Sequence, residues 1–132
     1  MFYKQFLKII DTLDESFVEE FDFWLATLPE RLAKTISVSA IASRFEVKYS
    51  TANAIVNFSE KEGILRKRYL VICGNEECQF FYGDFEADEL VKIMGKKVYC
   101  HNCSKEFKVS YENVLIVYAK VKKLSAAQIF DT

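Results

Sequence analysis

Four cysteines, arranged in two pairs, place the strongest constraint on how this chain of 132 residues can fold. Cys73 and Cys78 are separated by four residues, Cys100 and Cys103 by two, and 21 residues lie between the pairs. Four thiolates suit tetrahedral zinc, and zinc ribbons assemble them from two such pairs, each on a tight turn at the end of a β-hairpin. The spacing therefore predicts a four-cysteine structural site for one Zn²⁺.

The histidine inside the second pair, His101, raises two other interpretations. A redox Cys-x-x-Cys motif needs a βαβ setting and a thiol of low pKa at a helix N-terminus, and neither is apparent in the sequence. A catalytic Cys–His pair is disfavoured because adjacent residues rarely reach each other in a productive geometry. His101 could replace one cysteine as a ligand, but four thiols already fill the tetrahedron. We expect an exposed or hydrogen-bonding histidine beside a closed site.

Strand-forming sequence flanks both cysteine pairs. The pattern predicts strands at 64–72, 79–82, 97–99 and 107–109, with one or two helical turns at 88–94. The apolar segment 114–121 is expected to close this lobe. Because so small a lobe cannot build a large core, we expect the metal to contribute to its folding and the loss of one ligand to unfold it.

Residues 36–65 carry a second pattern, which predicts two helices joined by a very short connection. Apolar spacing predicts a short helix from near Ser39, a connection at 46–48 and a longer helix from near Ser50. Gly63 is expected to end the longer helix in a left-handed conformation. Helices joined by so short a turn cross steeply, so the second is expected to be exposed.

This segment resembles a winged helix-turn-helix. The resemblance is carried by Ile41, Ala42, Val47, Ser50, Thr51, Val56 and the run Glu60-Lys61-Glu62-Gly63-Ile64-Leu65. The chain departs from the family pattern at Glu46, Lys48 and Ala54, where a turn glycine, a capping serine and a phosphate-facing arginine are common. A winged helix followed by a zinc ribbon is similar to archaeal transcription factor E and its eukaryotic counterpart, and to small bacterial regulators. The resemblance implies work on polymerase and promoter.

Aromatic residues dominate the first 35 residues, where two amphipathic helices are predicted. The second is expected to be capped by Asp14 or Ser16 and to run to Pro29. Its aromatic stripe can be interpreted as core or as an interface for a protein partner or a second copy of the chain. The residues predicted for that interface are Phe2, Phe6, Phe17, Phe21 and Trp24.

Charge is distributed unevenly along the chain, although the net charge is only −1. Residues 31–72 hold eight Lys or Arg against three Glu, whereas residues 1–30 hold two Lys against seven acidic residues. A basic middle segment indicates DNA as a partner. Base contacts are expected from the longer helix that starts near Ser50, and phosphate contacts from the residues around it. The predicted DNA-binding residues are Arg44, Lys48, Tyr49, Ser50, Asn53, Asn57, Lys61, Arg66, Lys67 and Arg68. Residues 66–68 could instead keep a strand edge charged against sheet-to-sheet pairing.

The remaining features favour certain classes of function over others. The sequence has no recognisable pair of catalytic carboxylates, no glycine-rich phosphate loop and no open metal site, so we expect no enzyme. Its N-terminus lacks a secretion signal, and its longest apolar run, 114–119, is far shorter than the roughly 20 residues of a membrane helix. We therefore expect a cytoplasmic protein.

The sequence thus predicts an α+β protein in four parts. These are N-terminal helices (1–35), a winged helix-turn-helix (36–72), a β-rich zinc ribbon (73–121) and a tail (122–132). The favoured function is a DNA-binding regulator. The alternative is a docking adaptor or accessory subunit of a multi-protein complex, for example in bacterial defence. If DNA is bound, a homodimer through the N-terminal helices is the default expectation.

Overall fold

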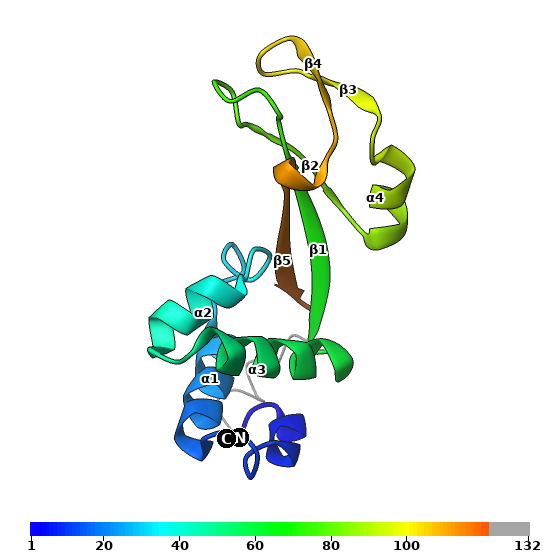
Figure 1. Ribbon diagram of the computed structural model, residues 1–132. Helices are drawn as coiled ribbons and strands as arrows, with labels where there is room; N and C mark the ends of the chain where they lie inside the picture. Colours follow the sequence, from blue (N-terminus) through cyan, green and yellow to red (C-terminus); the bar gives the residue numbers. More distant parts are fainter. Residues whose placement is uncertain (122–132) are drawn as a thin grey trace. The chain divides into compact units, whose positions relative to one another are not determined.

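The computed structural model describes residues 1–121 and has a mixed α+β architecture, in which three α-helices precede the strands and a fourth, short one lies between them along the chain (Figure 1). The predicted tail, 122–132, lies outside the described residues. The chain forms two compact units. The first, here called the helical unit, combines residues 1–66 with residues 118–121, and the second, here called the cysteine unit, is 67–117. The α+β class predicted from the sequence is confirmed.

The first long helix, α1 (Glu15–Thr27), begins where the sequence predicted. Asp14 caps it, because its side chain accepts a hydrogen bond of 3.1 Å from the backbone N–H of Phe17. The helix ends at Thr27, two residues before Pro29, which cannot continue a helix.

The segment before α1 differs from the expected amphipathic helix. It forms only a five-residue 3₁₀ helix, η1 (Lys4–Lys8), which is followed by turns up to residue 12. The carboxylate of Asp22, buried on α1, accepts hydrogen bonds of 2.8 Å from the N–H of Phe2 and 2.7 Å from that of Tyr3. These two bonds attach the N-terminal segment to α1.

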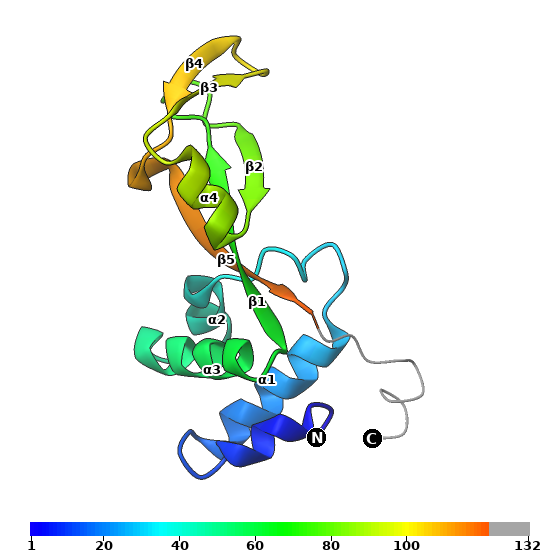
Figure 2. The same cartoon turned by 90° about the vertical axis from the view of Figure 1, so that its right-hand side faces the viewer.

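Two helices follow with only three residues between them: α2 (Val38–Phe45) and α3 (Tyr49–Lys61). The connection turns sharply because Glu46 adopts the left-handed conformation, with φ 54° and ψ 44°. Helix α3 ends as predicted, at Gly63 with φ +74°, where the N–H of Ile64 bonds to the carbonyl of Ser59. Figure 2 shows the pair on the helical unit.

Three strands form one sheet in the order β2-β1-β5, namely β2 (Phe81–Phe85), β1 (Leu65–Ile72) and β5 (Val114–Lys120). Strands β1 and β2 are antiparallel, with Tyr69 opposite Phe85. Strand β2 begins two residues later than predicted, because Gln79 still belongs to the preceding turn: its N–H bonds to the carbonyl of Asn75.

Strand β5 leaves the cysteine unit and ends in the helical unit. Tyr118 pairs with Ile36 through backbone hydrogen bonds of 2.7 and 2.9 Å, and the N–H of Lys120 bonds to the carbonyl of Ala33. The ammonium group of Lys120 also donates to the carbonyl of Leu25 at 2.8 Å, at the C-terminal end of α1. The boundary predicted at residue 121 therefore differs from the observed division of the chain, because residues 118–121 bond to the helical unit.

The cysteine unit is completed by a short helix and a second hairpin. Helix α4 (Ala87–Ile93) is followed by the antiparallel strands β3 (Lys97–Cys100) and β4 (Lys105–Lys108) and by the 3₁₀ helix η2 (Tyr111–Asn113). Its core contains Val71, Leu90, Phe107 and Val109 together with Cys73 and Cys100. Within residues 1–121, no helix combines the length and apolar character that crossing a bilayer requires.

Candidate metal centre

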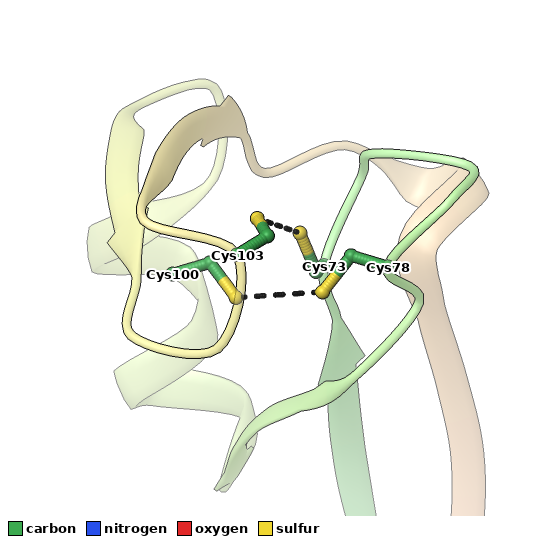
Figure 3. A group of neighbouring side chains, drawn as sticks. All are labelled: Cys73, Cys78, Cys100 and Cys103. Atoms are coloured by element: carbon green, nitrogen blue, oxygen red, sulfur yellow. Dashed lines mark hydrogen bonds between the residues drawn. The ribbon is translucent and has the colours of Figure 1, made fainter.

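The four cysteines meet at one end of the cysteine unit (Figure 3). Cys73 directly follows β1, and Cys78 lies on the loop between β1 and β2. Cys100 is the last residue of β3, and Cys103 lies on the turn to β4. All four Sγ atoms lie within 4.8 Å of one another, so they can coordinate a single metal ion.

The sulfur geometry can be compared with that of a tetrahedral zinc site. With zinc–sulfur bonds of about 2.3 Å, each edge of a regular tetrahedron of sulfurs is about 3.8 Å long. The distance from Cys73 Sγ to Cys103 Sγ is 3.8 Å, and that from Cys78 Sγ to Cys100 Sγ is also 3.8 Å. A disulfide would place two sulfurs about 2.05 Å apart, and all four thiols are free. The donor set therefore fits zinc.

Each cysteine pair is presented by a tight turn, as the spacing predicted. In the first turn the N–H of Cys78 bonds to the carbonyl of Asn75 at 2.9 Å, and the N–H of Cys73 bonds to that of Phe80 at 2.8 Å. In the second turn the N–H of Ser104 bonds to the carbonyl of Cys100 at 2.9 Å. These bonds close the backbone turn on each side of the site.

Two asparagine amides that the sequence reasoning did not identify donate to the sulfurs. Nδ2 of Asn75 lies 3.5 Å from the sulfurs of both Cys73 and Cys103, and Nδ2 of Asn102 lies 3.4 Å from that of Cys78. Amide donors favour the thiolate form, which is the form that binds metal. The only available signal in the sequence was position, since each asparagine lies between the cysteines of a pair.

The thiols differ in acidity for two physical reasons. The hydrogen bond from Asn102 lowers the pKa of Cys78 to about 7. Burial raises the pKa of Cys73 to about 11, because desolvation disfavours its thiolate. A bound cation would offset that desolvation by supplying the opposite charge.

His101 lies outside the ligand group formed by the four cysteines. It is exposed, and its ring packs edge-on against that of Tyr99 with a centroid separation of 5.2 Å. The four cysteines already supply a complete tetrahedron, so the arrangement leaves no position for a water or substrate ligand.

The residues predicted to bind DNA are not all equally accessible. Lys48, Tyr49, Ser50 and Asn57 are exposed at or on α3, whereas Asn53 is half-buried. Lys61, at the end of α3, is also exposed.

The arginines of the predicted set have different surroundings. Arg44, exposed on α2, lies over the rings of Trp24 and Phe45 at 6.0 and 5.8 Å. Arg66 is exposed, and Lys67 is half-buried. Arg68 pairs with Asp84 at 2.7 Å and with Glu86 at 3.2 Å, so its charge is balanced within the cysteine unit.

The aromatic residues predicted for a protein interface lie mostly in the core of the helical unit. Phe6 and Phe21 are fully buried and Phe17 nearly so, with Phe21 packed 5.7 Å from Phe6 and 6.2 Å from Phe17 between ring centroids. They leave almost no surface for a partner because the N-terminal segment folds over α1. Phe2 and Trp24 are half-buried.

Comparisons with known proteins leave the site to be interpreted on its own geometry. No family model matches the sequence, and neither the curated proteins nor the solved structures contain a significant match.

Proposed function

We propose that this protein is a non-enzymatic DNA-binding regulator, built as a winged helix whose wing carries a zinc-ribbon insertion. The observation that carries the proposal is the order of the elements that form the helical unit or enter it. Helix α1, the backbone bridge at Ile36, helices α2 and α3, and then strands β1 and β5 follow one another as in a winged helix-turn-helix. The family resemblance of residues 36–65 supports the same assignment.

The connectivity changes the place of the zinc ribbon relative to the sequence prediction. The ribbon was expected to follow the wing. Since Tyr118 and Lys120 of β5 bond to residues of the helical unit, β1 and β5 are taken as the two wing strands, with residues 73–113 inserted between them. On this interpretation the metal centre stabilises a large insertion in the wing.

The chemistry of α3 supports a role in reading DNA. Its apolar side, Ala52, Ile55 and Val56, is buried, and the opposite side is polar and exposed. Lys48 can contact a phosphate, and the amide of Asn57 can pair with an adenine edge in the major groove. Helices of this kind enter the groove with their N-terminal residues leading.

A structural zinc ion is part of the proposal. The sulfur distances and the amide donors support a closed four-thiolate site, whose metal would organise both turns and take no part in chemistry. Such sites contribute free energy of folding directly.

The proposal is tested by comparing α3 variants in a fluorescence-anisotropy titration with labelled duplex DNA. Lys48→Gln combined with Asn57→Ala is expected to weaken binding about tenfold or more, since one phosphate contact and one base contact are lost. The matched control, Lys4→Gln with Lys34→Gln, removes two exposed lysines of the helical unit and should bind like the unmodified protein. An α3 variant that binds duplex DNA as tightly as the control would refute the assignment of α3.

A docking role is the second candidate, and one observation favours it. A hollow on the helical unit is lined by Phe23, Trp24, Arg44 and Phe45, and Phe23 is 59% exposed although it is large and apolar. Exposed aromatic side chains beside an arginine are typical of protein interfaces. Loss of partner capture in Phe23→Ser, with duplex binding retained, would favour the adaptor.

A further inference from the structure

One face of the β3–β4 hairpin is used neither by the core nor by the metal centre. Cross-strand partners share a face, so Lys97 opposite Lys108 and Tyr99 opposite Glu106 lie together on one side. All four are exposed, whereas Phe107, on the other side, is buried. These four residues are called the outer hairpin face; Figure 2 shows the two strands that carry it.

Lysine is concentrated in the segment that contains the hairpin; Lys97 and Lys108 lie on the outer hairpin face, whereas Lys105, opposite Cys100, lies on the other side. Residues 90–110 hold five lysines and one glutamate, although residues 67–117 together hold seven basic and eight acidic residues. Lys97 and Lys108 face each other directly, and like charges in that position destabilise an antiparallel pair. Among the described residues, no ion pair joins Glu106 to either lysine. A polyanion would relieve this repulsion.

An aromatic ring, that of Tyr99, lies beside the lysine pair on the same face, opposite Glu106. Tyr99 is 48% exposed, and the edge-on contact with His101 holds its ring at an interplanar angle of 79°. Its strand leads directly into Cys100, so formation of the metal centre fixes the position from which Tyr99 projects. The ring of Tyr99 is therefore half-exposed and held in one orientation before any ligand binds.

We propose that the outer hairpin face binds a single-stranded segment of nucleic acid, with a base stacked on Tyr99 and phosphates near Lys97 and Lys108. An aromatic ring beside a pair of cations can bind a single strand, because every unpaired base offers a free ring face and every nucleotide a negative charge. A duplex hides its base faces in its own stack. This proposal adds a second surface to the proposed DNA-binding function and does not depend on α3.

The test is an anisotropy titration of zinc-loaded protein into a labelled oligothymidine of about 16 nucleotides. Lys97→Gln with Lys108→Gln should raise the Kd at least tenfold, and the slope of log K against log salt should become shallower by about 1.4, since each phosphate contact on a single strand contributes about 0.7. Tyr99→Ala should raise the Kd about tenfold with little change in that slope.

Matched controls separate this surface from general effects of substitution. Tyr111→Ala removes another tyrosine of the same unit, one that is 86% exposed, and should leave the Kd unchanged. Zinc content is measured for every variant, and a content equal to that of the unmodified protein shows that the hairpin is still formed. The α3 variant Lys48→Gln with Asn57→Ala should bind oligothymidine normally, even if it loses duplex DNA.

Three results would overturn the proposal. They are no binding of oligothymidine by the unmodified protein at about 50 mM salt, a Tyr99→Ala variant that binds as tightly as Tyr111→Ala, and displacement by polyglutamate as effective as by unlabelled oligothymidine. The last would define a surface for acidic peptides. Duplex binding that requires α3, without oligothymidine binding, would leave the proposed function intact and refute this proposal alone.

Discussion

Individual side chains set the chemistry of this protein at two places, the cysteine cluster and the carboxylate of Asp22. The cysteine cluster could be predicted from the sequence because two thiol pairs at short spacing are the usual ligand pattern of a four-cysteine zinc site. Asp22 could not be predicted. It lies on a helix with several acidic residues, where a carboxylate is normally solvated, and its burial depends on the path of the N-terminal segment.

Replacing one ligand should remove the metal. For Cys103→Ser we expect loss of bound zinc and a lower thermal midpoint, because a structural zinc site contributes binding free energy of about 10–16 kcal/mol that depends on all four thiolates. Ser104→Ala, at the neighbouring position of the same turn, is the control and should keep its zinc. Metal analysis and thermal denaturation of both variants check this, and a Cys103→Ser variant with full zinc content and unchanged midpoint would contradict the four-thiolate site.

Asp22 should make the free energy of unfolding depend on pH. Burial raises its pKa above the ordinary 3.8, and the hydrogen bonds from Tyr3 and Phe2 and the charge of the N-terminus only partly oppose this. The folded protein therefore holds a proton that the unfolded chain releases, and the contribution of Asp22 to the free energy of unfolding falls as pH rises from 3.8 through the folded pKa.

Urea denaturation of the unmodified protein and of Asp22→Asn, over a series of pH values from neutral downward, measures this contribution. We expect the unmodified protein to gain stability relative to Asp22→Asn as the pH is lowered through the folded pKa. A stability difference that stays constant over the whole series would show that Asp22 titrates normally.

The positions of helices and strands were predicted better than the pairing of the strands. Apolar spacing and capping residues placed α1, α2 and α3 to within a few residues, because those signals are local. The partner of β5 could not be predicted in this way: its apolar pattern indicates a strand, but says nothing about which distant residue it pairs with. The bridge between Ile36 and Tyr118 joins residues far apart in sequence.

The attachment of β5 to the helical unit gives a prediction for one side chain. The ammonium of Lys120 bonds to the carbonyls of Leu25 and Ala26, where the last turn of α1 contains no basic residue of its own. Lys120→Met should lower the free energy of unfolding by about 1 kcal/mol, since it removes a charged donor from a helix C-terminus. Lys34→Met, at an exposed position, should change it little, and urea denaturation compares the two. Equal stability of both variants would contradict this contact.

At the scale of the whole molecule, each of the two units has its own hydrophobic core and its own candidate surface. We propose α3 of the helical unit as the surface for a duplex and the outer hairpin face of the cysteine unit as the surface for a single strand. The sequence analysis divided the chain into four consecutive segments, because local patterns do not show which distant segments pack together. The structure instead gives one unit two separate chain segments.

The central claim is that this chain binds DNA through phosphate and base contacts around α3. The most direct measurement is the affinity of the zinc-loaded protein for duplex DNA at several salt concentrations between about 50 and 200 mM. With Arg44, Lys48, Lys61 and Arg66 as phosphate contacts, the account predicts that log K falls against log salt with a slope of about −3 to −4, since each contact on B-DNA contributes about 0.9. No binding at the lowest salt, or an affinity that does not change with salt, would contradict it.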